Sequence, residues 1–105
     1  MKWFLVAALA LLPFSAAAQA IDIQVDNFTA QRGISELVLK VTNNTGADVE
    51  SLFIDCAFLR EDGRAIDIGK VLISTLAAGE YAYDKASIGT TDGVSQAECR
   101  VVKFR

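Results

Sequence analysis

Residues 37–69 read LVLKVTNNTGADVESLFIDCAFLREDGRAIDIG, and we expect the rest of the chain to pair with this stretch. It contains a strand-like segment from Leu37 to Thr42, a polar turn, and a long apolar segment from Val49 to Leu59. The polar turn is rich in Asn and Gly, which tolerate left-handed backbone. A turn signal at Asp62–Gly63 then returns the chain as Ala65 to Ile68. The pattern predicts consecutive antiparallel strands joined by tight turns.

The segment from Val49 to Leu59 is expected to be a central strand, because both of its faces are apolar. Alternation along a strand puts one set of side chains on one face and a second set on the other. The two sets are Leu52, Ile54, Cys56 and Phe58, and Phe53, Asp55, Ala57 and Leu59. A strand with two apolar faces is typical of a position covered on one side and partly covered on the other.

Further strands are predicted by alternation of apolar and polar residues. Outside residues 37–69 the expected elements are a strand over 21–25, a connection over 27–34, an apolar run over 71–73, a turn over 76–80, a strand with Tyr81 and Tyr83 on one face, a loop from Gly89 to Gly93, and a last strand over 95–104. Gly69 is interpreted as a bulge or bend. No segment after Ala20 has a sustained helical period. We therefore predict an all-β fold, a small antiparallel β-sandwich of about six to seven strands.

The first 20 residues have the pattern of a cleaved signal peptide. Lys2 precedes an unbroken apolar run from Trp3 to Leu12, and Pro13 ends that run. Residues 18–20, Ala-Gln-Ala, match the small-x-small pattern of signal peptidase, so we expect cleavage after Ala20, with Ala18 as the nearest competing site. The alternative is an uncleaved membrane anchor, but a spanning helix needs about 20 apolar residues and this run is interrupted earlier. The expected location is therefore the periplasm or the secreted space.

Residues 21–105 are expected to form a single domain without a membrane anchor. Removing residues 1–20 takes away one lysine and no acid, so the net charge changes from −3 to −4. The remaining basic residues are scattered singly, which argues against nucleic acid or an anionic membrane as a partner. A domain of this size buries only about 60–65% of the surface of its unfolded chain, so its stability is marginal without reinforcement.

Two cysteines, Cys56 and Cys99, offer that reinforcement. They are the only pair in the chain, and an exported protein meets an oxidising compartment in which disulfides persist. We therefore predict a disulfide between them, with two separate buried thiols as the alternative. A redox-active pair is disfavoured, because the two residues are far apart in sequence and form no C-x-x-C motif.

The strand spacing, and a cysteine pair that joins an early strand to the last one, are similar to immunoglobulin and fibronectin type III sandwiches. The antibody-type hallmarks are missing, since the only tryptophan is Trp3 and residue 97 is alanine instead of tyrosine. The comparison therefore concerns the sandwich architecture alone.

A closer resemblance is carried by motifs between Leu37 and Tyr83. They are Asn43-Asn44-Thr45-Gly46, Leu52-x-Ile54-x-Cys56-x-Phe58, Asp62-Gly63 and Leu76-x-x-Gly79-Glu80. The pattern resembles the small extracytoplasmic bacterial sandwiches typified by the FxLYD-type domain, although Phe58-Leu59-Arg60-Glu61 departs from the aromatic-Asp ending of that family's strand. The resemblance implies an accessory or interaction module with no established chemistry.

Catalysis is disfavoured by the composition. The chain has no histidine, which removes the usual general base, the commonest metal ligand and every Ser-His or Cys-His nucleophile pair. Glu61, Asp62 and Asp67 cluster in sequence as a formal calcium site, but a solvated turn is the preferred interpretation. We therefore expect no enzyme activity, no metal and no cofactor. A calcium-dependent or hydrolytic enzyme stays as a remote alternative.

The candidate binding residues are Phe53, Leu59, Tyr81 and Tyr83. Aromatic anchors on a sheet face are typical of protein interfaces, and edge strands also accept peptides by strand addition. The competing interpretation packs these residues under loops or at the ends of the sandwich. The sequence thus predicts a non-catalytic module that binds another envelope or secreted protein. An inhibitor or sensor of a secreted enzyme, acting through the Gly89–Gly93 loop, is the alternative.

Overall fold

The computed structural model describes residues 20–105, so the predicted signal peptide lies outside the described residues except for Ala20. The strands are β1 (Ile21–Gln31), β2 (Ile34–Asn43), β3 (Val49–Leu59), β4 (Ala65–Leu76), β5 (Tyr81–Ile88) and β6 (Gln96–Lys103). No helix within residues 20–105 is long and apolar enough to cross a membrane. The prediction of an all-β fold is confirmed.

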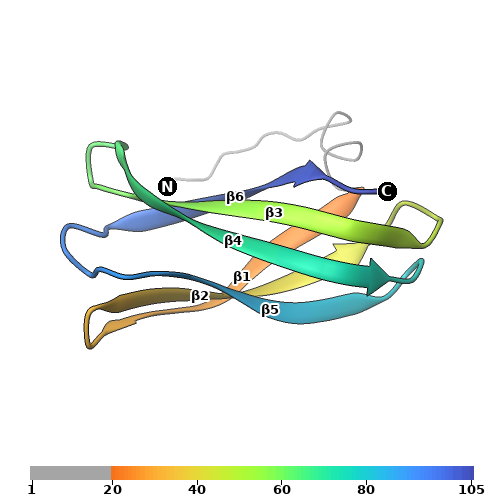
Figure 1. Ribbon diagram of the computed structural model, residues 1–105, viewed down its shortest axis with the longest axis horizontal. Coiled ribbons are helices and arrows are strands. Elements are labelled where there is room, and N and C mark those ends of the chain that lie inside the picture. The colour runs from red at the N-terminus through yellow and green to blue at the C-terminus, as the bar shows by residue number, and fades with distance from the viewer. Residues whose placement is uncertain (1–19) are drawn as a thin grey trace, which may run out of the picture.

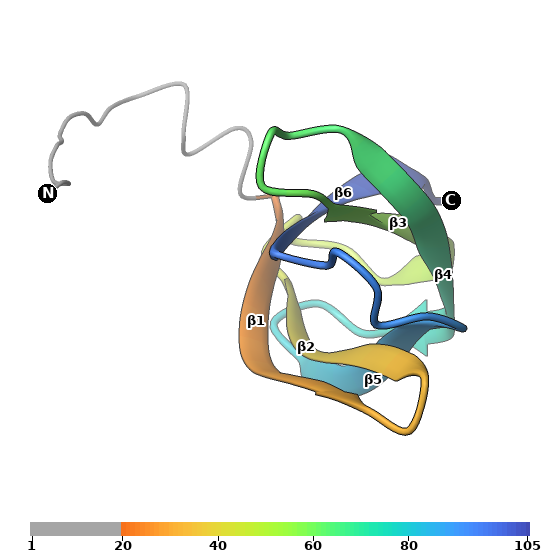
Figure 2. The same ribbon diagram turned by 90° about the vertical axis from the view of Figure 1, so that its left-hand side faces the viewer.

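The strands form two three-stranded antiparallel sheets that face each other, as Figure 1 and Figure 2 show from two sides. One sheet has the order β1-β2-β5, and the other has the order β4-β3-β6. The apolar segment Val49–Leu59 is the central strand of its sheet, as its two apolar faces predict.

The hydrophobic core lies between the two sheets and is built from alternate residues of each strand. Its buried members are Ile21, Leu37, Leu39, Val41, Val49, Leu52, Ile54, Cys56, Phe58, Val71, Ile73, Leu76, Ala86 and Ile88. The two central strands, β2 and β3, supply the largest of the fully buried side chains, because they have a neighbouring strand on each side. Burial of their apolar surface stabilises the fold by about 25 cal/mol per Å².

The first strand is longer than the sequence predicts. The expected connection over 27–34 is wrong, because β1 continues to Gln31 and pairs with β2 through a turn at Arg32 and Gly33. The φ angles of these turn residues are 55° and 76°, and two-residue hairpin turns with positive φ match the natural twist of the strands. The pairing register shifts between Val25 and Asn27, and such a bulge interrupts the alternation that marks a strand.

The predicted disulfide between Cys56 and Cys99 is present. The two residues lie directly opposite each other on β3 and β6, and their Cα atoms are 4.0 Å apart. Antibody-type domains place this bond between the two sheets, whereas here it joins neighbouring strands of one sheet. The similarity to the immunoglobulin cysteine pair is wrong in this respect. The bond fixes the edge strand β6 to β3 and does not link the two layers.

Along one flank of the sandwich, β4 runs beside β5 of the other sheet (Figure 1). Gly69 of β4 lies at this contact. A Cβ atom on residue 69 would lie 3.0 Å from the backbone N and O atoms of Ser87 and 3.3 Å from Cβ of Ala86. The predicted bulge is wrong, since the pairing of β3 with β4 is regular at Gly69 and shifts between Phe58 and Leu59. Glycine at this position instead permits the close approach of a second backbone.

Gly69→Ala is expected to lower the free energy of unfolding by about 2 kcal/mol, because the added methyl group forces β4 away from β5. Urea unfolding followed by circular dichroism measures the change. Gly89→Ala is the matched control, since a Cβ atom there meets nothing within 4 Å, and it should change the free energy by less than about 0.5 kcal/mol. Equal effects of the two substitutions would contradict the assigned role of Gly69.

Asn43 is a fully buried polar residue at the end of β2. Its Nδ2 atom donates to the carbonyl oxygens of Ala47 and Leu76, at 2.8 and 2.9 Å. Its Oδ1 atom accepts the backbone N–H of Thr45 at 3.0 Å, and its own backbone N–H donates to the carbonyl oxygen of Glu80 at 2.9 Å. One residue therefore joins the turn after β2 to the end of β4 in the opposite sheet.

Candidate binding surfaces

Tyr81 and Tyr83 lie side by side on the outer face of β5. Their ring centroids are 5.8 Å apart and the ring planes make an angle of 83°, which is an edge-to-face arrangement. The two side chains are 58% and 55% exposed. A spacing of two residues along a strand puts both on one face, as the sequence predicts. We call Tyr81 and Tyr83, together with Lys40, the tyrosine face.

Lys40 of β2 completes the tyrosine face. Its Nζ atom lies 4.4 Å from the centroid of the Tyr81 ring, which is within the range of a cation–π interaction. The register of β2 with β5 places Lys40 opposite Tyr83 and Thr42 opposite Tyr81. The two rings and the ammonium group are therefore held by regular strand pairing, and the face carries one positive charge beside two aromatic rings.

The other two candidate residues lie elsewhere. Phe53 is on β3, in the opposite layer, where the Nζ atom of Lys103 is 5.2 Å from its ring centroid. Leu59 ends the same strand at the register shift and is only 9% exposed. The expectation of one surface around all four residues is wrong: Tyr81 and Tyr83 are brought together, Phe53 is separated from them, and Leu59 is buried.

Besides Phe53, the β4-β3-β6 layer and the chain end after it carry exposed apolar residues that sequence reasoning missed. They are Ile68, Leu72, Val102 and Phe104. Leu72 lies opposite Phe53 in the pairing of β4 with β3. The apolar run 71–73 contained a signal for Leu72. Side chains alternate along a strand, so Leu72 must point to the face opposite to that of Val71 and Ile73, which are in the core.

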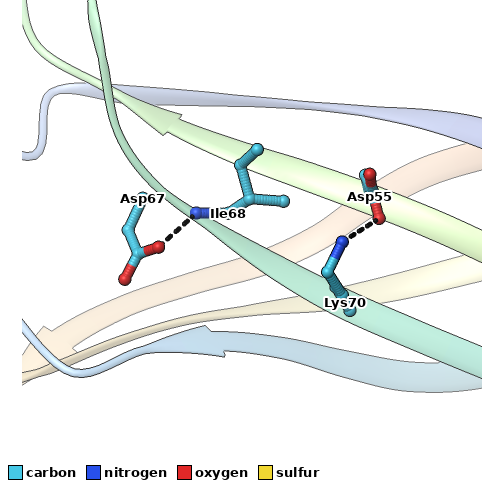
Figure 3. Close-up of polar contacts among 4 residues, drawn as sticks. All are labelled: Asp55, Asp67, Ile68 and Lys70. Carbon is cyan, nitrogen blue, oxygen red and sulfur yellow. Dashed lines mark hydrogen bonds and ion pairs between the residues drawn. The ribbon is translucent and has the colours of Figure 1, made fainter.

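Of Glu61, Asp62 and Asp67, the acidic residues weighed as a calcium site, the two aspartates accept neighbouring backbone N–H groups. Figure 3 shows Asp67, whose Oδ1 atom accepts the backbone N–H of Ile68 at 2.8 Å, and also Asp55, which was not part of that set and whose Oδ1 atom lies 3.3 Å from Nζ of Lys70. Asp62 accepts a backbone N–H two residues further on, at 3.0 Å. Among residues 20–105, no three acidic, cysteine or histidine side chains are grouped so that they could hold a metal ion.

The Gly89–Gly93 loop is anchored by a buried serine. Ser35, at the start of β2, donates through Oγ to the carbonyl oxygen of Thr90 at 2.7 Å. Within the loop, the backbone N–H of Asp92 donates to Oγ1 of Thr90 at 3.1 Å. The loop that the sequence offers as an inhibitory element is thus tied to the start of β2.

The flank between β1 and β6 is open. An apolar groove with a volume of about 290 Å³ lies there, lined by Val25, Phe28, Leu37, Ser95, Gln96 and Ala97. Val25 and Phe28 pair with Leu39 and Leu37, which belong to the core, so they lie on the inner face of β1. They are nevertheless 51% and 42% exposed. We call this region the open flank.

Comparison with known proteins identifies no relative. No protein-family model, no curated protein and no solved structure matches this chain. The resemblance to FxLYD-type domains therefore stands on its motifs alone, and the architecture shown is a small antiparallel β-sandwich. A disulfide in such a small domain is consistent with an extracytoplasmic location.

Proposed function

We propose that this chain is an exported, non-catalytic β-sandwich that binds another envelope or secreted protein through its tyrosine face. The observation that carries the proposal is the exposure of two adjacent tyrosines on a regular sheet face, each more than half accessible. Tyrosine is enriched at protein interfaces and among the residues that dominate binding energy. Each ring brings a large apolar area and a hydroxyl group that can reach a polar partner.

The geometry of the tyrosine face favours a protein partner over a small molecule. Both rings stand on β5, which is held by its pairing with β2. Little backbone freedom is therefore lost when a partner covers them. Lys40 adds one positive charge at 4.4 Å from the Tyr81 ring, and a partner with an acidic residue at the rim of its surface complements that charge. Both rings are more than half exposed on the outer face of a sheet, which suits a flat protein surface.

Export and the absence of catalysis rest on the sequence. The signal-peptide pattern of residues 1–20 predicts transport to the periplasm or the secreted space, and the Cys56–Cys99 disulfide suits an oxidising compartment. The chain lacks histidine, the residue type most often used as a general base. The resemblance to FxLYD-type domains, which implies an accessory or interaction module, agrees with a binding role.

Tyr81→Ser combined with Tyr83→Ser is expected to weaken capture of the partner from envelope extract by on the order of tenfold or more, because both aromatic anchors are lost. Chemical cross-linking of the tagged protein in intact cells, followed by mass spectrometry, identifies the partner, and titration then gives the dissociation constant.

Leu72→Ser is the matched control for this experiment. Leu72 is 53% exposed on the opposite layer, so its replacement removes a similar exposed apolar group and leaves the tyrosine face intact. Equal loss of binding in the control and in the tyrosine variant would count against the proposal. Unchanged binding in the tyrosine variant would do the same.

A further inference from the structure

Of the four edge strands in the two sheets, β6 has the edge best suited to pair with another strand. The edges of β4 and β5 lie against each other through Gly69 and Ser87, and β1 is interrupted by its register shift after Val25. The pairing of β6 with β3 is regular from Gln96 to Val101 and shifts only after Val101, toward the end of the strand. The inward residues Ala97, Cys99 and Val101 are uncharged. An inward-pointing charge is one of the features by which proteins prevent an edge strand from pairing, and this edge lacks it.

The pairing with β3 determines which backbone groups β6 leaves unpaired. The 4.0 Å between the Cα atoms of Cys56 and Cys99 is typical of a non-hydrogen-bonded pair, in which N–H and C=O point away from the facing strand. The hydrogen bond from the backbone N–H of Ser95 to the carbonyl oxygen of Leu59 agrees with this assignment. Cys99, and with it the alternate residues 97 and 101, therefore direct their backbone groups toward the outer edge.

The exposed charges on this edge are self-complementary. Glu98 and Arg100 flank Cys99, both are exposed, and neither takes part in an ion pair within residues 20–105. A two-fold axis through Cys99 places Glu98 of one chain opposite Arg100 of a second chain, and does so twice. The same axis sets Ala97 opposite Val101 and brings the unpaired N–H and C=O groups of the two edges into register.

We propose that the β6 edge pairs with the β6 edge of a second copy of this chain, so that two β4-β3-β6 sheets form one continuous six-stranded sheet. The two ion pairs lie directly across the new strand pair, where side chains are closest. The second copy also covers the open flank, where the inner faces of Val25 and Phe28 are exposed beside Ala97. This contact is separate from the tyrosine face.

The test uses charge reversal on protein produced from the full-length chain, with sedimentation equilibrium as the readout. The wild-type protein is expected to form a dimer. Glu98→Arg or Arg100→Glu should each raise the dimer dissociation constant by on the order of tenfold or more, since each places like charges opposite one another twice. A mixture of the two variants should form a heterodimer, because every facing pair is then opposite in charge.

Two further variants separate edge pairing from other contacts. The double variant with Glu98→Arg and Arg100→Glu should dimerise like the wild type. Ala97→Pro should abolish the dimer while leaving the fold unchanged by circular dichroism, because it removes an N–H that points away from β3. A wild-type chain that stays monomeric at submillimolar concentration overturns the proposal. A dimer that survives both single charge reversals but is lost on Tyr81→Ser also overturns it and places the contact on the tyrosine face.

Discussion

Replacing Cys56 and Cys99 together by alanine is expected to lower the free energy of unfolding by about 4 kcal/mol. The bond joins residues separated by 43 positions, and closing a loop of that length restricts the unfolded chain by roughly this amount. Domains of this size have a total stability on the order of 5–10 kcal/mol, so the variant should retain only about 1–6 kcal/mol. Urea unfolding of the oxidised wild type and of the variant measures the difference.

The reduced wild-type protein provides the control. Reductant should bring the wild type close to the double-alanine variant and should leave the variant itself unchanged. A loss below about 1 kcal/mol would mean that the unfolded chain is already restricted without the bond. Such a result would contradict the idea that this small sandwich depends on its disulfide.

Asn43→Ala is expected to cost about 3 kcal/mol of unfolding free energy. The substitution leaves the carbonyl oxygen of Leu76 and the backbone N–H of Thr45 without their side-chain partner, whereas the carbonyl oxygen of Ala47 keeps a hydrogen bond from Oγ1 of Thr45 at 2.8 Å. Each buried polar group left unsatisfied costs about 1–3 kcal/mol, and water reaches the exposed part of the turn and offsets some of the loss. Urea unfolding gives the size of the effect.

Asn27→Ala is the matched control for Asn43→Ala, because Asn27 is an exposed residue of β1 with the same side chain. It should change the free energy of unfolding by less than about 0.5 kcal/mol. Amide hydrogen exchange adds a spatial readout: Asn43→Ala should speed exchange at the turn after β2 and at Glu80 more than in the centre of β3. Uniform acceleration throughout the chain would contradict the local role assigned to Asn43.

Most of the strands could be predicted from the sequence because apolar alternation is a local signal. It identified the central position of Val49–Leu59 and the inner face of Leu37, Leu39 and Val41. The second half of β1 was missed, since the register shift after Val25 moves the apolar residues out of phase. A bulge is decided by pairing with the next strand, and a single strand read alone does not contain that information.

The candidate surface was only partly predictable for a related reason. Tyr81 and Tyr83 share a face because they are two residues apart on one strand. Whether Phe53 joins them depends on which sheet β3 and β5 enter, and crossovers between the layers decide that. Leu59 is buried because the pairing of β3 with β4 shifts beside it. The burial of Asn43 was equally hidden, since an Asn-Asn-Thr-Gly sequence indicates a turn and not a buried amide.

The two flanks of the sandwich, β4 with β5 and β1 with β6, are closed to different degrees, so the two sheets should separate from one side. The backbones approach closely at Gly69 and Ser87 along one side, whereas the side beside Val25 and Phe28 has an open apolar groove. Local unfolding begins where the fewest buried contacts resist it. The two sheets should therefore separate first at the flank of β1 and β6, with the β1–β2 hairpin detaching first. The contact between β4 and β5 should separate last.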